Sequence, residues 1–253
     1  MERVTLPDGR RAVRKQRRDM PAGFFAAEAR GLDALRAADG LRVPEVYALG
    51  HDHIVLEDLG AGRPAPDFHI RAGAGLARQH LQVGTRFGFD HDGWCGDSAQ
   101  DNTPAEDGHA FFVERRLLPQ AQRARDGGRL HATDIARVER VCARLPSLVP
   151  AQPPVLLHGD LWTGNLHCDG DGRPALIDAG AVHYGWAEAE LAMLILFGSP
   201  PPAFFRAYAG LAPLDPDWRE RAPLYNLYHL LNHLNLFGAS YTGAVQAVLR
   251  RFA

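Results

Sequence analysis

Asp160, Asn165 and Asp178 are the side chains whose types and spacing best suit chemistry on a phosphate group. Mg²⁺ takes carboxylate or amide oxygens from a protein, while a separate carboxylate can accept the proton of an attacking hydroxyl. Asp160 and Asn165 are five residues apart, the spacing of the catalytic Asp and the metal-binding Asn in kinase catalytic loops. The pattern predicts Asp160 as a general base and Asn165 and Asp178 as Mg²⁺ ligands.

Short apolar runs flank these residues and predict the strands that must position them. The runs are Val155–Leu157, Leu166–Cys168 and Ala175–Ile177, with an Asp- and Gly-rich turn before the third. Asp160, Asn165 and Asp178 are therefore expected on loops beside strand ends. A β meander with solvated acids is the alternative that involves no chemistry.

A wider set of motifs resembles the fructosamine kinase (ketosamine-3-kinase) family, a branch of the protein-kinase-like fold related to aminoglycoside and choline kinases. The motifs are His158–Asn165 (HGDLWTGN), Ile177-Asp178, Tyr184-Gly185 and Glu190–Met193 (ELAM). His158, Asp160 and Asn165 alone fit any of these branches, whereas the Leu161-Trp162 pair and the two last motifs favour this one. The resemblance implies ATP and Mg²⁺ as cofactors. It also implies phosphorylation of the O3 hydroxyl of a ketosamine, carried by a small glycated amine or a glycated protein lysine.

The resemblance assigns further roles. His158 is expected to brace the catalytic loop. Trp162 is expected to offer an aromatic face to the sugar, with a place in the hydrophobic core as the alternative. The backbone of Glu57, Asp58 and Leu59 is expected to hydrogen-bond adenine.

Lys15 is the only lysine among 28 basic residues, which suggests a site that needs a compact point charge rather than a planar guanidinium. It lies at the end of a predicted strand, in a hairpin that turns at Asp8-Gly9. Glu28 lies on the apolar face of a helix predicted over 21–38, where a half-buried carboxylate needs a cationic partner. The sequence thus predicts a Lys15–Glu28 ion pair, of the kind that orients nucleotide phosphates in kinases.

These elements predict an α+β, two-lobed, protein-kinase-like fold. Residues 1–58 are expected to form a small β-rich N-lobe for the nucleotide, and 59–253 a larger, mostly helical C-lobe with the catalytic loops. Kinases of this fold begin with a strand and a glycine-rich loop over the phosphates. The sequence shows neither before the predicted hairpin, so we expect an N-lobe that lacks them. Either translation starts upstream of Met1, or nucleotide binds without that loop.

The remainder of the chain is predicted to be mostly helical. Helices are expected around 76–81, from Phe111, after a cap at Thr133, and over 187–197, 202–208, 217–237 and 241–252, with a polar loop over 85–109. His229 and His233 are four apart on one of these helices, a spacing that can hold a metal ion. Because leucines surround them and no third ligand is near, we interpret them as core or capping residues.

Bulk composition excludes several classes of protein. A net charge of −2 argues against general nucleic-acid binding. No run of 18 apolar residues and no signal sequence is found, so we expect a cytoplasmic protein without membrane contact. Cys95, Cys142 and Cys168 are scattered without CxxC spacing, which predicts neither disulfides nor a zinc site. The sequence does not indicate an oligomeric state.

Three other functions stay open at this point. An aminoglycoside or choline-type kinase would use the same loop residues. A metal phosphoesterase could use His158, His167 and the two aspartates, but it gives no role to Lys15 or Asn165. A nucleotide-binding pseudokinase is favoured only by the absence of a glycine-rich loop.

Overall fold

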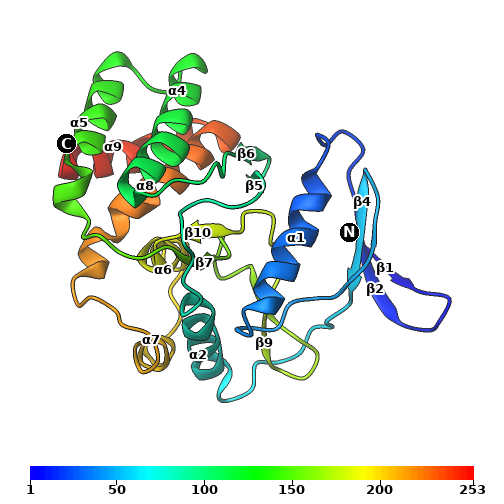
Figure 1. The fold of residues 1–253 in the computed structure, drawn as a ribbon. Coiled ribbons are helices and arrows are strands. Elements are labelled where there is room, and N and C mark those ends of the chain that lie inside the picture. The colour runs from blue at the N-terminus through cyan, green and yellow to red at the C-terminus, as the bar shows by residue number, and fades with distance from the viewer.

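The computed structural model describes residues 1–253, which fold into a small lobe built on a β-sheet and a larger, mainly helical lobe (Figure 1). The strands of the small lobe are β1 (Glu2–Thr5), β2 (Arg11–Gln16), β3 (Val46–Leu49) and β4 (His53–Glu57). They form one antiparallel sheet in the order β1-β2-β4-β3. The β1–β2 hairpin turns at Gly9, whose φ of 86° is a left-handed conformation that suits glycine. The predicted hairpin and the two later strands are confirmed.

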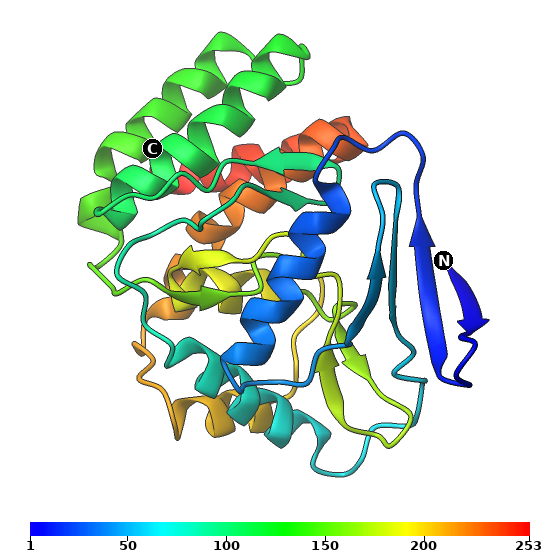
Figure 2. The ribbon, with the colours of Figure 1, turned by 45° about the vertical axis from the view of Figure 1, so that its right-hand side comes forward.

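Helix α1 (Phe24–Ala37) lies between this sheet and the larger lobe (Figures 1 and 2). Leu32 and Leu35 are buried along one face, and Glu28 is buried among them, as the apolar period predicted. The period also placed Phe24 on this face, but the structure buries Phe25 there and leaves Phe24 only partly buried. The helix contacts β3 and β4 on one side and strand β5 (Gly93–Cys95) of the larger lobe on the other. It therefore couples the sheet to the rest of the molecule.

In the larger lobe, helices surround three pairs of short strands. Its helices are α2 (Phe68–His80), α3 (Gly108–Phe112), α4 (Leu118–Asp126), α5 (Ala132–Leu148), α6 (Ala187–Leu194), α7 (Pro202–Ala209), α8 (Trp218–Phe237) and α9 (Thr242–Phe252). A π-helical turn, η1 (Val113–Leu117), joins α3 to α4, and a 3-10 turn, η2 (Ala239–Tyr241), precedes α9. Helices α2 and α7 cover one end of the lobe, and α4, α5 and α9 cover the other (Figures 1 and 2).

The candidate loops are held by two antiparallel strand pairs. Strand β7 (Val155–Leu157) pairs with β10 (His183–Gly185), and β8 (Leu166–Cys168) pairs with β9 (Pro174–Leu176). The three predicted strands are thus confirmed, the third beginning one residue earlier than expected. Ile177 N–H also donates to Asn165 C=O at 3.2 Å, so the loops over 158–165 and 177–182 lie against each other.

Two expectations for the larger lobe were wrong. The polar stretch 85–109 contains a hairpin, β5 (Gly93–Cys95) and β6 (Ser98–Gln100), which turns at Gly96 with a φ of 59°. Helix α5 begins before Thr133, because His131 is its N-cap and the Asp134 carboxylate accepts the His131 N–H at 3.4 Å. Thr133 therefore lies inside the first turn and caps nothing.

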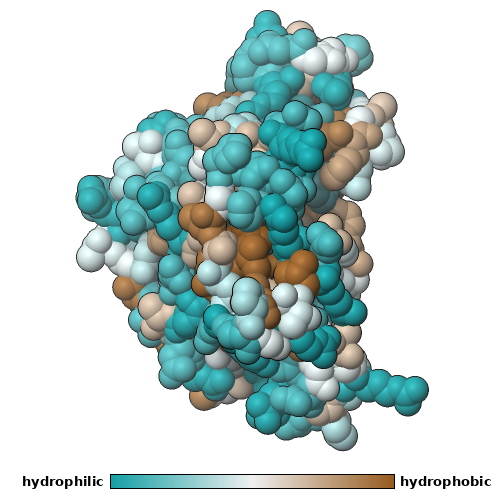
Figure 3. Space-filling view, turned by 90° about the vertical axis from the view of Figure 1, so that its right-hand side faces the viewer, coloured by the Kyte–Doolittle hydropathy of each residue, from teal (hydrophilic) through white to brown (hydrophobic).

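One cluster of 50 buried residues extends from Phe25 in α1 to Phe252 in α9, so the lobes share a continuous core. Seen from the side of the small lobe, the surface is mainly hydrophilic with one hydrophobic area near its centre (Figure 3). None of the helices combines the length and the hydropathy needed to cross a bilayer. The lobe boundary at residues 58 and 59 stays a prediction, because a shared core marks no break in packing.

Candidate active site

A cavity of about 430 Å³ lies between the two lobes, and six of the predicted site residues line it. These six are Lys15, Glu28, Asp160, Trp162, Asn165 and Asp178. They come from β2, α1 and the two loops beside β7 and β9. Of the remaining predicted residues, His158 lies behind the catalytic loop, and Glu57, Asp58 and Leu59 do not line this cavity.

The loop that carries Asp160 turns sharply at Gly159, whose φ is 82°. A Cβ atom at this position would lie 2.0 Å from the Ala181 carbonyl oxygen, so any larger residue would push the two loops apart. The glycine lets the catalytic loop touch the segment that follows Asp178. This contact brings two carboxylates from different loops to the same cavity.

His158 is fully buried and makes two hydrogen bonds that fix its tautomer. Its Nε2 donates to the Ile177 carbonyl at 2.8 Å, and its Nδ1 accepts the Asp160 backbone N–H at 3.4 Å. The imidazole therefore links the residue before Asp178 to the backbone of Asp160. This geometry agrees with the bracing role expected from the resemblance. Both ring nitrogens are engaged with the backbone, so neither is available to a reacting group.

A buried carboxylate, Glu190 of α6, supports the same loop from beneath. It accepts the backbone N–H groups of His158 at 3.1 Å and Gly159 at 2.8 Å. His80 Nε2 donates to the same carboxylate at 3.0 Å, and Tyr208 contacts the other ring nitrogen of His80. Burial acts to raise the pKa of Glu190, but these bonds outweigh it and lower the pKa. The sequence placed Glu190 in a family motif without revealing this role, because the loop and α6 meet only in the fold.

Asn165 closes the catalytic loop on itself. Its Nδ2 donates to the Asp160 carbonyl at 2.8 Å, which fixes the amide with its oxygen available to a ligand. The Asp178 carboxylate lines the same cavity and follows β9. Asp178 has a φ of 62°, an uncommon left-handed conformation for a residue with a Cβ, which Asp tolerates better than most. Strained backbone of this kind is often found where a side chain must point at a ligand.

Lys15 forms the predicted ion pair with Glu28, with 2.5 Å between Nζ and Oε1. Its ammonium also contacts the Asp178 carboxylate from the opposite lobe. Burial acts against the positive charge of Lys15, but the two carboxylates outweigh burial and raise its pKa. Lys15 is therefore a charged group, and it bridges the glutamate of α1 and the aspartate that follows β9.

Asp160 is the carboxylate best suited to take a proton. Burial, together with the nearby charge of Asp178, raises its pKa from 3.8 to about 7. Hydrogen bonding from the Cys95 thiol acts in the opposite direction. A general base is most effective when its pKa lies near the working pH, so Asp160 is poised for proton transfer around neutrality.

The segment Glu57–Leu59, expected to hydrogen-bond adenine, begins at the end of β4 and contains one backbone N–H without a protein partner. Asp58 N–H donates to Arg11 C=O, and Leu59 C=O accepts from Gly170 N–H. Leu59 N–H has no protein partner, which makes it the group in this segment that a ligand can use. The Asp58 side chain fixes the turn, since it accepts Gly60 N–H at 2.9 Å.

The donor set suits a hard divalent cation. Asn165 and Asp178 carry oxygen donors and line one open cavity, and Mg²⁺ is typically bound by one or two such groups plus substrate phosphates and water. The histidines needed for a phosphoesterase are engaged elsewhere. His158 donates to Ile177 C=O, and His167 Nε2 contacts the carbonyl of Gly60 at 2.6 Å. Neither ring faces the aspartates as a ligand.

The two lobes, with a cavity between them, place this protein in the class of the protein-kinase-like fold. An amicoumacin kinase solved with AMP-PNP and Ca²⁺ superimposes with a TM-score of 0.58 at 13% identity, over 99% of this chain and 84% of that one. At this identity the likeness concerns the fold alone.

The chain belongs to the fructosamine kinase family, whose family model matches residues 6–253. A probable ketoamine kinase from Enterococcus faecium is 39% identical over 236 residues, which cover 91% of this chain and 83% of the relative. A crystal structure from Thermobifida fusca, provisionally named a fructosamine-3-kinase, has a TM-score of 0.91 and 40% identity, over 98% of this chain and 87% of that one. The resemblance inferred from the motifs is confirmed, and so is the two-lobed fold.

Proposed function

We propose that this protein is an ATP- and Mg²⁺-dependent kinase that phosphorylates the O3 hydroxyl of ketosamines, in the repair of glycated amines or proteins. Fructosamine, ribulosamine and erythrulosamine adducts are the substrates considered. The observation that carries the proposal is the convergence of Lys15, Asp160, Asn165 and Asp178 on one cavity. Membership of the fructosamine kinase family supports the substrate class. Phosphoryl transfer needs positioning and charge neutralisation more than covalent chemistry, and these residues supply both.

In the proposed mechanism, Asp160 accepts the proton of the O3 hydroxyl as that oxygen attacks the γ-phosphate. Its pKa of about 7 makes it a stronger base than an ordinary aspartate, while leaving much of it ionised at neutral pH. The hydrogen bonds from His158, Gly159 and Asn165 hold the loop, so the carboxylate need not reorganise during the reaction.

Lys15 is proposed to orient the nucleotide phosphates while Glu28 holds it in place. To do so, the ammonium must exchange its contact with Asp178 for one with phosphate oxygens. Asp178 is then free to act with Asn165 as an oxygen ligand. Bound Mg²⁺ would supply the positive charge that neutralises the phosphate oxygens. The free N–H of Leu59 is proposed to donate to adenine, in the segment Glu57 to Leu59.

The proposed sugar site is a second cavity of about 340 Å³ beside Asp160. Its wall is largely hydrophobic and includes the aromatic residues Trp162, Phe197, Phe237 and Tyr241. Trp162 keeps 41% of its surface exposed, which favours a ligand-facing role over the core alternative. Asp160 is the only acid in this wall, whereas a polycationic aminoglycoside would need several carboxylates. The cavity therefore favours a ketosamine over an aminoglycoside.

Turnover of synthetic adducts tests the proposal. ADP should form when enzyme, ATP and Mg²⁺ meet fructosamine or ribulosamine adducts, but not with the matched 3-deoxy or 3-O-methyl adducts. ATP-dependent thermal stabilisation without ADP formation would indicate a pseudokinase. Hydrolysis of simple phosphate esters without ATP would indicate a phosphoesterase, and turnover of 3-O-methyl adducts would move the reaction to another hydroxyl.

A further inference from the structure

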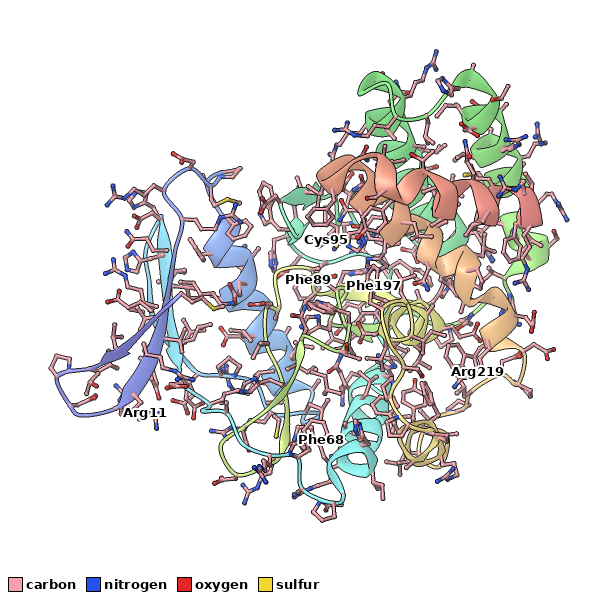
Figure 4. All side chains as sticks on the ribbon, turned by 180° about the vertical axis from the view of Figure 1, so that it is seen from behind. Arg11, Phe68, Phe89, Cys95, Phe197 and Arg219 are labelled. Atoms are coloured by element: carbon pink, nitrogen blue, oxygen red, sulfur yellow. The ribbon has the colours of Figure 1, made fainter.

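Three side chains from distant segments meet beside the proposed sugar cavity, whose wall includes two of them, Cys95 and Asp160. Cys95 ends β5, Asp160 lies on the catalytic loop and His229 lies in the middle of α8. One sulfur, oxygen or nitrogen atom of each lies within 4.8 Å of the other two. Cys95 Sγ and His229 Nδ1 are 3.9 Å apart, and Nδ1 has no other polar partner. Cys95 is labelled in Figure 4, close to Phe197 of the same cavity wall.

The donor types distinguish this cluster from the proposed Mg²⁺ site. A thiolate and an imidazole are ligands of Zn²⁺ and similar ions, whereas Mg²⁺ prefers oxygen alone. Zn–S and Zn–N bonds together span roughly 4.3 Å, which exceeds the 3.9 Å between Cys95 Sγ and His229 Nδ1. One ion can therefore bind both atoms with a bent angle between them. A shift of roughly an ångström in the Asp160 carboxylate would complete three ligands of a tetrahedron.

The ligands are held in place, and an ion can reach them. Asn232 Nδ2 donates to the Cys95 carbonyl at 3.1 Å, which ties β5 to the helix that carries His229. Such outer contacts fix the orientation of metal ligands. Cys95 and Asp160 both line the open cavity of about 340 Å³, so a cation can enter and keep a fourth position for water.

We propose that Cys95, Asp160 and His229 form an inhibitory site for a thiophilic divalent cation such as Zn²⁺. Binding releases the Cys95 thiol proton to solvent, leaves His229 bound through its neutral Nδ1, and engages the Asp160 carboxylate. A carboxylate bound to Zn²⁺ can no longer accept the proton of a substrate hydroxyl. The inhibition rests on the role proposed above for Asp160, whereas the metal site does not.

Sequence spacing could not reveal this cluster. The sequence indicated a core or capping role for His229 and His233, because no third ligand is near them in the chain. In the fold, His229 lies with Cys95 and Asp160, and His233 is not part of this cluster. The cysteines lack CxxC spacing, and the other two ligands come from segments that meet Cys95 only in the folded chain. No local motif therefore marks the cluster.

Cobalt spectroscopy tests the site without nucleotide or substrate. Co²⁺ should bind the wild-type protein at one equivalent and give a near-ultraviolet thiolate-to-metal absorption band, which Zn²⁺ displaces. Cys95→Ser and His229→Gln should each abolish or strongly weaken the band. Cys142→Ser, which removes a free thiol on α5 that is not part of the cavity wall, should leave it intact. Absence of the band in wild type, or its persistence in Cys95→Ser, overturns the site.

Kinase assays with Mg²⁺ in excess test the inhibition. Zn²⁺ should inhibit wild type at concentrations at least roughly tenfold lower than Cys95→Ser or His229→Gln, and a chelator should restore activity. Equal inhibition of all three proteins would show that Zn²⁺ acts on Mg²⁺–ATP instead and would overturn the inhibitory role. If no variant turns over ketosamines, the proposed function fails, while the cobalt band still decides the metal site.

Discussion

The Lys15 ammonium touches the Asp178 carboxylate across the cleft between the lobes, although the two residues are 163 positions apart. Lys15 also pairs with Glu28, so the lysine proposed to orient phosphates is held by a carboxylate from each lobe. In the proposed mechanism, nucleotide binding must replace the Asp178 contact and keep the Glu28 contact. Because Lys15 contacts Asp178 here, Asp178 would have to leave the lysine in order to hold a metal ion. Loss of Lys15 should therefore affect both phosphate and metal binding.

The Lys15–Glu28 pair gives the first prediction. Lys15→Arg keeps the charge but should cost roughly tenfold or more in kcat/KM, because a planar guanidinium cannot occupy the same point between two carboxylates. Lys15→Met should cost at least as much. Steady-state kinetics of both variants, with circular dichroism to confirm folding, checks this. Wild-type activity in Lys15→Arg would reduce Lys15 to a strand-end charge.

A double-mutant cycle extends that test. Lys15→Met leaves Glu28 buried without its partner and should cost on the order of 3–5 kcal/mol of stability if water stays excluded. Glu28→Gln leaves Lys15 with Asp178 as its remaining carboxylate and should cost less. Because the two side chains are in contact, the losses should be markedly non-additive in urea unfolding. Arg11→Gln with Glu28→Gln is the matched control, since Arg11 lies on the same strand, pairs with Asp58 instead, and should give additive losses.

Asp178 provides the second prediction. Asp178→Asn should fold, because Asn tolerates a φ of 62°, yet it should remove most of the Mg²⁺ dependence of ATP binding. Asp178→Ala should lose the same dependence and also stability, since Ala is strained in this conformation. Calorimetric titration of ATP with and without Mg²⁺ measures the effect. Unchanged Mg²⁺ dependence in Asp178→Asn would assign the metal to other residues.

The sequence was most informative where local pattern and chemistry agreed. The Lys15 strand, the α1 helix with its buried Glu28, and the strands beside Asp160 and Asp178 follow from apolar period and turn residues, so they were predictable. Contacts between distant segments were not. The short hairpin at Cys95 has strands too brief to give an apolar alternation. Nothing near Glu190 in sequence shows that its carboxylate would meet the backbone of Gly159.

Glu190 gives the third prediction. Glu190→Gln replaces an acceptor with an amide that can accept at one atom only, so one buried N–H of His158 or Gly159 loses its partner. The cost should be on the order of 1–3 kcal/mol in stability, with a fall in kcat because the loop under Asp160 loosens. The lowered pKa of Glu190 means that its stabilisation is present above its ordinary pKa of 4.5 and fades as the pH falls below that value.

A nearby carboxylate separates the two effects of Glu190→Gln. Glu188 is equally buried in α6 but pairs with Arg221 and Tyr225, away from the catalytic loop. Glu188→Gln should lower stability while the folded enzyme keeps its kcat. If both variants lose kcat to the same extent, Glu190 acts through general stability and not through the loop.

Asp160 gives the last prediction, in which catalysis and stability should respond oppositely to pH. As the proposed base it must be unprotonated, so kcat/KM should rise with pH up to about 7 and then level. Bound metal would neutralise Asp178, one cause of the raised pKa, so the acid limb of kcat should lie at lower pH than that of kcat/KM.

The stability of the folded protein should depend on pH in the opposite direction. A carboxyl whose pKa is raised from 3.8 to about 7 favours its protonated form in the native state, so its contribution to stability is best at low pH and is lost as the pH rises through that interval. Asp160→Asn removes this loss, and at pH 8 it should be more stable than wild type by up to about 4 kcal/mol, the equivalent of a three-unit shift. This gain in stability should vanish below pH 4.

Asp160→Asn should keep ATP binding while kcat falls roughly 10²–10⁴-fold, the range for a positioned base. Chemical unfolding at pH 4 and pH 8, beside kinetics over the same range, measures both effects. If Asp160→Asn gains stability but keeps its kcat, Asp160 is a buried acid that lowers stability without acting as the base. Another group would then remove the proton.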